Sequence, residues 1–255
     1  MDNTQNIISF CTGYSGLELG IKRAGVDVRT ICYLEIEVYV QAVLVKAIQE
    51  GRLCPAPIWT NVKSFDARPF RGVVDGITGG FPCQPFSSAG KRKGQEDPRH
   101  LWPSIANAIR LCRPGWVFLE NVPGLVTLGL RDVLQDLGQM GYRTTWGIFS
   151  AEEVGAPHQR KRVFILANPT SRQPRQSQAR NGGQDTSGGS EETQWPARPG
   201  EEQYEWEEPR VTEAQSELGG ATHGTQHRVD RLRLLGNGVV PQTAELAWKT
   251  LWKEM

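Results

Sequence analysis

Cys83 stands between two prolines in the stretch GGFPCQPFSSAG (residues 79–90). Neither a helix nor a central strand can run through this stretch, because proline lacks the backbone N–H that both structures use. The apolar run before it, residues 72–81, is typical of a buried strand that closes on a glycine pair. We therefore expect a thiol presented on a stiff turn at the end of a strand. Such a position suits a nucleophile, whereas an ordinary free cysteine is a small buried hydrophobe.

A carboxylic acid and two arginines follow on later strand-like runs. Glu120 ends the run WVFLEN, and beside a nucleophilic cysteine it would be a proton donor rather than a solvated or capping acid. Arg160 and Arg162 alternate at the start of the run in HQRKRVFILA (residues 158–167). Side chains two residues apart on a strand share a face, so both arginines would point to one side and could face the same cleft. A surface basic cluster is the alternative for this pair.

A glycine-rich turn follows the first apolar run, in FCTGYSGLELG (residues 10–20). Gly13 and Gly16 would place a tight turn and a close helix start at the carboxyl edge of a sheet, where nucleotides usually bind. Glu35 follows Gly16 by 19 residues, a spacing that suits an acid for ribose hydroxyls. A Walker lysine and a third phosphate-binding glycine are missing from the sequence of this turn. It therefore predicts a site for an adenosine without a pyrophosphate, with a simple strand-to-helix loop as the alternative.

The elements that must position these residues follow an α/β pattern. Five short apolar runs read as strands: residues 7–11, 30–36, 73–81, 116–121 and 162–167. Helix-like segments lie between them, such as residues 129–141, where Leu130, Val133, Leu134 and Leu137 fall on one face and Gly141 is a plausible stop. Strands that are apolar throughout and separated by helices predict a mainly parallel sheet covered on both sides.

The α/β pattern ends after Ala167. Residues 168–229 are rich in Gly, Ser, Gln, Arg and Glu, and are predicted to form a short polar insertion with a flexible part. Order is expected to return in residues 230–255, where a helix carries an apolar face made of Ala244, Ala247, Trp248 and Leu251. That face should dock on the core formed by residues 1–167, so the main domain is predicted to be discontinuous.

The composition narrows the class of protein further. The chain has 255 residues and a net charge of +1, so no global charge draws it to nucleic acid. We expect no transmembrane span and no signal peptide, because no long apolar run and no basic start are present. The five cysteines are odd in number and lack paired metal spacing, which favours free thiols in a cytoplasmic protein without a metal.

Four motifs together resemble a known family. GGFPCQPFSSAG, LENV, QRKR and LGN, in this order and spacing, resemble the DNA (cytosine-5) methyltransferases, with phage and prophage members closest in character. The resemblance covers residues 5–167 and about 227–253. It implies a Rossmann-like core that uses S-adenosylmethionine, a short target-recognition insertion, and double-stranded DNA as the partner. Because the target atom is hidden in the duplex, a cytosine would have to be flipped out.

The resemblance also implies roles for single residues in the reaction. Cys83 would attack carbon 6 of the cytosine, Glu120 would protonate ring nitrogen 3, and Arg160 and Arg162 would hold the base and favour the thiolate. Residues 87–100 would form the loop that closes over the flipped base. The substrate-binding residues implied in this way are Gln84, Ser87, Lys91, Arg92 and Asn121, the last as a support of the loop.

Binding of S-adenosylmethionine would fall to Phe10, Thr12, Gly13, Gly16, Glu35, Asn61, Pro82 and Asn237. Two departures from the family pattern lie among them. Ser9, Phe10 and Cys11 stand where the family usually has Asp-Leu-Phe, so the stacking phenylalanine is displaced by one position. Asn61 replaces the aspartate expected to meet the adenine amino group, and Asp66 is a possible substitute.

Several alternatives stay open at this point. A transfer-RNA cytosine-5 methyltransferase would use the same chemistry on another nucleic acid. A catalytically silent nucleic-acid binder would lack at least one of the four candidate catalytic residues, and all four are present. We expect a monomer, because flipping a base by this chemistry needs one active site. Neither the target site nor membership of a restriction-modification system, phage self-protection or an orphan role follows from the sequence.

Overall fold

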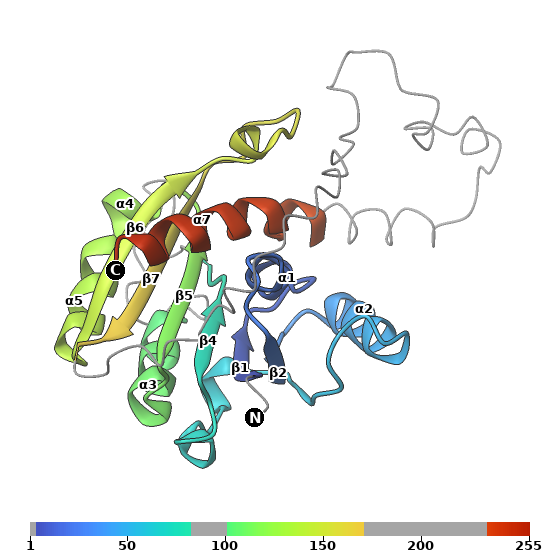
Figure 1. The fold of residues 1–255 in the computed structure, drawn as a ribbon. Coiled ribbons are helices and arrows are strands. Elements are labelled where there is room, and N and C mark those ends of the chain that lie inside the picture. The colour runs from blue at the N-terminus through green and yellow to red at the C-terminus, as the bar shows by residue number, and fades with distance from the viewer. Residues whose placement is uncertain (1–3, 83–100, 171–233) are drawn as a thin grey trace, which may run out of the picture.

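The protein forms a seven-stranded sheet with helices on both faces (Figure 1). The structure is a computed structural model and describes residues 4–82, 101–170 and 234–255. The strands lie in the order β3-β2-β1-β4-β5-β7-β6. Their bounds are β1 Gln5–Phe10, β2 Val28–Leu34, β3 Ile58–Trp59, β4 Gly76–Gly79, β5 Trp116–Asn121, β6 Tyr142–Phe149 and β7 Arg162–Pro169. The first five strands pair in parallel, while β7 runs antiparallel to both β5 and β6.

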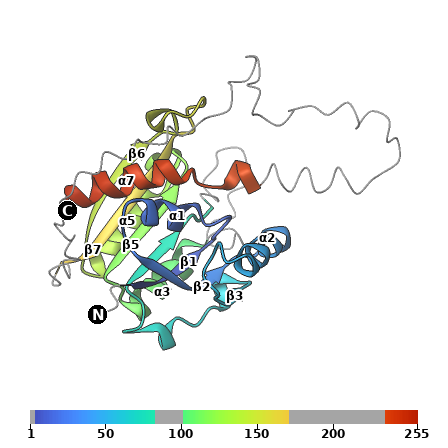
Figure 2. The same ribbon diagram turned by 45° about the vertical axis from the view of Figure 1, so that its right-hand side comes forward.

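The helices form the two outer layers. They are α1 Gly16–Arg23, α2 Val38–Gln49, α3 Trp102–Cys112, α4 Leu125–Leu128, α5 Leu130–Gln139 and α7 Pro241–Lys253, with short 3-10 turns η1 Val62–Ser64, η2 Arg68–Phe70 and η4 Glu152–Val154. The helices α1 and α7 pack against each other on one face of the sheet (Figures 1 and 2). The helices α3 and α5 share a core with the opposite face. The predicted α/β fold with a mainly parallel sheet is confirmed.

The central strand β5 shows why the sheet must be covered on both sides. All six of its residues are buried, and its side chains alternate between the two cores. Trp116 and Phe118 pack with α1 and α7, while Val117 and Leu119 pack with α3 and α5. Four consecutive apolar residues on a strand leave both of its faces in need of cover.

Both helices predicted in detail are present. In α5, Leu130, Val133 and Leu137 are buried, and the helix ends two residues before Gly141. In α7, Ala244, Ala247, Trp248 and Leu251 are all buried against the main core, as the apolar spacing predicts. The chain after the insertion therefore returns to the core.

The structure contains two strands that were not predicted, the two-residue strand β3 and the strand β6, and it extends β7 beyond the predicted end. The strand β6 was missed, because in YRTTWGIF polar and apolar residues mix, and as an edge strand it leaves Trp146 and Ile148 exposed. The strand β7 continues through Pro169, so the first two residues assigned to the insertion belong to the sheet. Residues 171–229 lie outside the described residues, and the domain boundaries stay a prediction.

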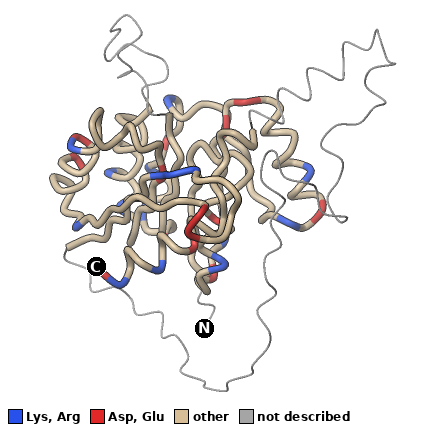
Figure 3. The backbone as a smooth tube through the Cα atoms, turned by 90° about the horizontal axis from the view of Figure 1, so that it is seen from above, with Lys and Arg blue, Asp and Glu red and all other residues tan. Residues whose placement is uncertain are grey.

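Charges of both signs are interspersed over the described part of the chain (Figure 3). From Ser88 to Arg113 the sequence carries six Lys or Arg and two acids, which predicts a local basic field. Four of the six basic residues lie within residues 83–100, which the structure does not describe. Among the described helices, none is long and apolar enough to cross a membrane.

Candidate active site

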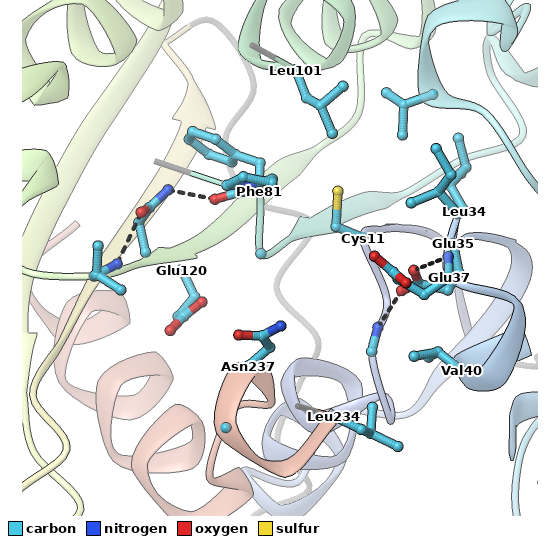
Figure 4. Close-up of a pocket in the computed structure, with 18 of the residues that line it drawn as sticks. Cys11, Leu34, Glu35, Glu37, Val40, Phe81, Leu101, Glu120, Leu234 and Asn237 are labelled. Atoms are coloured by element: carbon cyan, nitrogen blue, oxygen red, sulfur yellow. Dashed lines mark hydrogen bonds between the residues drawn. The ribbon is translucent and has the colours of Figure 1, made fainter. Parts of the chain in front are cut away.

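One pocket opens at the edge of the sheet where the parallel strands end (Figure 4). Its volume is about 810 Å³, and residues that directly follow β1, β2 and β4 line it together with the end of β5. The carboxyl edge of an open α/β sheet is where ligands usually bind. Of the candidate site residues, the pocket gathers Gly13, Glu35, Asn61, Pro82, Glu120, Asn121, Arg162 and Asn237.

Glu120 and Arg162 form a buried ion pair on one side of this pocket. Arg162 Nε lies 2.8 Å from Glu120 Oε1, and the two side chains are 17% and 8% exposed. The strand order explains their meeting, because β7 is antiparallel to β5 and its first residue lies at the edge where β5 ends. Burial raises the pKa of Glu120 to about 7, while the charges of Arg162 and Arg160 act in the opposite direction. Glu120 can therefore hold a proton near neutral pH.

This pKa predicts a pH-dependent stability that Glu120→Gln would remove. The folded protein binds the proton more tightly than the unfolded chain, whose carboxyl titrates near the ordinary value of 4.5. The carboxyl's contribution to the free energy of unfolding is therefore full below about pH 4.5 and is lost as the pH rises to about 7. Urea unfolding of both proteins between these limits measures it. Parallel profiles of wild type and variant would contradict the prediction.

Asn121 anchors the chain that leads to the predicted nucleophile. Its Nδ2 donates to the Phe81 carbonyl at 2.8 Å, and its Oδ1 accepts from the Val122 N–H at 2.9 Å (Figure 4). The residue after Phe81, Pro82, lines the pocket, and Cys83 follows it in the sequence. The predicted residues Cys83, Gln84, Ser87, Lys91 and Arg92 lie outside the described residues.

Glu35 organises the other side of the pocket. Its Oε2 accepts from the Gly13 N–H at 2.9 Å, and its Oε1 accepts from the Glu37 N–H at 3.0 Å (Figure 4). Gly13 has a φ of 57°, in the left-handed region that favours glycine. The glycine-rich turn and the acid at the end of β2 are thus in direct contact, as the spacing predicts.

The variant Glu35→Gln tests this side of the pocket. The amide is neutral and has one oxygen instead of two, so both N–H groups lose a charged acceptor and one of them loses its acceptor altogether. We expect the affinity for S-adenosylmethionine to fall about tenfold or more, as judged from the usual value of hydrogen bonds to charged groups. Isothermal titration calorimetry measures it. The control is Glu50→Gln, which removes a surface carboxylate paired with Arg52, and an equal loss in both variants would contradict the prediction.

Asn61 lines the pocket at the start of η1, whereas Asp66 does not. Asn61 Oδ1 accepts from the Lys63 N–H at 2.9 Å. The NH₂ group of the same side chain can still donate to a ligand in the pocket. Asp66 is exposed and pairs with Arg68, with 2.8 Å between Oδ2 and Nη2. Asn61 is therefore the better placed of the two for an adenine.

Three predicted cofactor residues do not line the pocket. Phe10 is 1% exposed and packs edge-to-face on Phe65 in the core, because its side chain faces inward from the last position of β1. Thr12 donates to the Ser9 carbonyl at 3.1 Å, and Gly16 packs against the backbone of Val239. The residue at this point of the pocket wall is Cys11, which the prediction omitted.

Arg160 lies beside Arg162 but not on its strand. It precedes β7 and has a φ of 36°, so the expected alternation along one strand is corrected. Its guanidinium donates to the Gly236 carbonyl at 2.8 Å and to the Gly238 carbonyl. Arg160 thus contacts the segment that carries Asn237, whose side chain lies near Glu120 in the pocket (Figure 4).

The pocket also contains residues that sequence reasoning missed. They are mostly apolar, and examples from six different segments are Ile36, Tyr39, Val62, Phe81, Leu101, Val122 and Leu234. Ile36, Val62 and Val122 directly follow predicted site residues, which is a signal that could have found them. The others are brought together by the fold. In the described part of the chain, no group of His, Cys, Asp and Glu could hold a metal ion.

Comparison with known proteins assigns the chain to a family. The sequence matches the family model described as C-5 cytosine-specific DNA methylase over residues 5–219. It is similar to the Type II methyltransferase M.NgoMIV of Neisseria gonorrhoeae, with 33% identity over 63% of this chain and 50% of the relative. It is also similar to M.NgoBV of the same organism, with 29% identity over 65% of this chain and 41% of the relative.

Solved structures share the fold. The S. pombe Dnmt2 methyltransferase superposes with a TM-score of 0.55 at 21% identity, over 66% of this chain and 52% of that protein. The chain spans about half or less of the length of the curated relatives named above. The family model nevertheless matches most of the chain, and the protein belongs to the C-5 cytosine-specific DNA methylase family.

Proposed function

We propose that the protein transfers a methyl group from S-adenosylmethionine to carbon 5 of a cytosine in double-stranded DNA. The observation that carries this proposal is the buried pair of Glu120 and Arg162 in one pocket with Glu35 and Gly13. An acid that can be protonated near neutral pH and an adenosine-type site thus share one pocket. Membership of the family supports the same reaction.

The chemistry needs an acid and a nucleophile together. Carbon 5 of cytosine is a poor nucleophile, so the ring must first be activated. The Cys83 thiolate would add to carbon 6 while Glu120 gives its proton to ring nitrogen 3, which leaves an enamine that is nucleophilic at carbon 5. After methylation, a water molecule would take the carbon 5 proton, the C–H electron pair would form the double bond between carbons 5 and 6, and the bond to sulfur would break to release the thiolate. Glu120 would recover its proton from nitrogen 3.

Arg162 would keep Glu120 oriented during this cycle. Arg162 Nε lies 2.8 Å from Oε1 of Glu120. The other carboxyl oxygen, Oε2, lies next to Gly80, where an added Cβ atom would be 3.4 Å from it. A glycine at this position leaves room in front of the carboxyl group. The pair is therefore arranged to present one carboxyl oxygen to a base.

The pocket residues fit S-adenosylmethionine. Glu35 would accept from the ribose hydroxyls, and the Asn61 amide and the apolar side chains of Ile36 and Val62 would meet the adenine. Asn237 and Pro82 would close the pocket on the side of the reacting groups. When bound, S-adenosylmethionine supplies the methyl group, and these residues bind and orient it.

The flipped cytosine would enter beside Pro82, with Gln84, Ser87, Lys91 and Arg92 on the DNA side. Flipping costs a few kcal/mol, which contacts to the DNA must offset. We propose a monomer that acts on chromosomal or phage DNA in the cytoplasm of a bacterial or phage-infected cell. No metal is required for this chemistry.

The proposal is tested in a host that lacks cytosine methylation. The chain is expressed there, and bisulfite sequencing of the DNA reports activity and target site together. Methylated cytosines in one short sequence context are expected. An unmethylated genome with methylated transfer RNA would favour the transfer-RNA enzyme, and no methylation of either would favour a silent nucleic-acid binder.

A further inference from the structure

Residues 236–239 form a short segment whose first two residues are part of the pocket wall. Gly236 and Asn237 line the pocket, and the Gly238 N–H donates to the Leu234 carbonyl at 2.9 Å, which completes a helical turn. Figure 4 shows Asn237 between Glu120 on one side and Glu35 and Glu37 on the other. The position of this segment therefore decides the shape of the pocket.

Tyr14 holds this segment from the side of the glycine-rich turn. Its hydroxyl donates to the Val239 carbonyl at 2.5 Å. Burial raises the pKa of Tyr14, so the hydroxyl keeps its proton and stays a donor. Tyr14 directly follows Gly13, whose N–H is bound by Glu35. One residue thus joins the turn at β1 to the far end of the chain.

The ring of Tyr14 also occupies the space next to Gly238. A Cβ atom at Gly238 would lie 1.7 Å from Cε1 of the ring, a distance that no real contact allows. The φ of Gly238 is outside the left-handed region, so glycine is needed here for close approach and not for backbone conformation. The Tyr14 ring can therefore occupy this position only because residue 238 has no side chain.

Arg160 holds the same segment from the side of the acid. Its guanidinium donates to the carbonyls of Gly236 and Gly238. Arg160 stands two residues before Arg162, the arginine that pairs with Glu120. The backbone of residues 236–239 thus has donors on both flanks, Tyr14 and Arg160. Neither contact involves the side chain of Asn237, which is left to face the pocket.

We propose that Tyr14 is a positioning residue for the cofactor site: its hydroxyl and ring hold residues 236–239 so that Asn237 is already in place when S-adenosylmethionine binds. A site held in its bound geometry loses less conformational freedom on binding, which raises affinity. This inference rests on the proposed function, because the ligand is the methyl donor proposed there.

The test is Tyr14→Phe, which removes the hydroxyl and keeps the ring. Isothermal titration calorimetry without DNA is expected to show S-adenosylmethionine bound about fivefold more weakly, from the usual value of one hydrogen bond. Hydrogen exchange followed by mass spectrometry, without cofactor, should become faster in residues 234–240. Affinity and exchange equal to the wild type would overturn the inference.

The matched control is Tyr142→Phe. Tyr142 is buried, its hydroxyl donates to the Pro114 carbonyl at 2.9 Å, and neither residue lines this pocket. This variant should lower thermal stability while cofactor affinity stays within about twofold of the wild type. An equal loss of affinity in both variants would show a general effect of stability and would overturn the inference. If the wild type itself failed to bind S-adenosylmethionine, the proposed function would fall and the inference with it.

A double substitution separates the ring from the hydroxyl. Gly238→Ala should weaken cofactor binding about tenfold in the wild type, because its methyl group overlaps the Tyr14 ring. In the Tyr14→Ala background the same change should cost less than about twofold, since the space is then open. Equal losses in the two backgrounds would overturn the role assigned to the ring.

Discussion

Replacing Cys83 with serine is expected to lower the rate of methyl transfer at least about a thousandfold, because the nucleophile is removed. A serine hydroxyl is far less acidic than a thiol, so almost no anion is available to add to carbon 6. Transfer of labelled methyl from S-adenosylmethionine to duplex DNA measures the rate. Binding of the cofactor should change little, since other side chains, those of Glu35 and Asn61, would hold the adenosine.

Cys54→Ser is the control for this experiment. Cys54 is a free cysteine outside the pocket, with its sulfur 3.9 Å from Lys22 Nζ. Its replacement should leave methyl transfer close to the wild-type rate. Undiminished transfer by Cys83→Ser would show that another residue is the nucleophile and would remove the central step of the proposed mechanism.

The second large effect is expected from Glu120→Gln. The amide keeps the size of the side chain but has no proton to give to ring nitrogen 3, and it leaves Arg162 without its charged partner. Loss of a general acid typically costs about 10²–10⁴-fold in rate. Because burial raises the pKa of Glu120 to about 7, the wild-type rate should decline as the pH rises through that value. Rates at saturating cofactor between pH 6 and pH 9 measure both effects, and this range is chosen as about one to two units on either side of that pKa.

Glu245→Gln separates the loss of an acid from the loss of an ion pair. Glu245 also pairs with an arginine at 2.8 Å, Arg23, but on the surface between α1 and α7. This variant should keep both the rate and its decline near pH 7. If Glu120→Gln kept the same decline, a different group would be the acid.

The structure confirms those predictions that depend on short stretches of sequence or on neighbouring strands. WVFLEN is a strand over the residues predicted, because a short run that begins with four apolar residues is typical of a strand buried on both faces. The contact between Gly13 and Glu35 follows from adjacent parallel strands whose ends meet at one edge. The family resemblance carried by PCQPFS, LENV and QRKR is confirmed by the match over residues 5–219, while its phage character stays a prediction.

Local pattern was a poor guide where a residue's partner lies far away along the chain. The strand β6 escaped detection because one of its faces is exposed and its residues do not alternate regularly. Arg160 and Arg162 look equivalent in QRKR, yet one binds backbone carbonyls at the end of the chain and the other binds Glu120. Phe10, expected in the cofactor site, lies in the core, and Cys11, to which no role was assigned, lines the pocket, since only the orientation of β1 decides which side chain faces inward.

The sequence by itself determined which chemical groups stand at the strand ends: a thiol, an acid, arginines and a glycine turn. These depend on residue type and on spacing over a few residues, which the chain carries locally. Only the tertiary structure decided how the groups are paired and held. Tyr14 meets Val239 across 225 residues of chain, and such a contact depends on how α1 and α7 pack on one face of the sheet. No local pattern encodes it, because the two partners become neighbours only when the whole core forms.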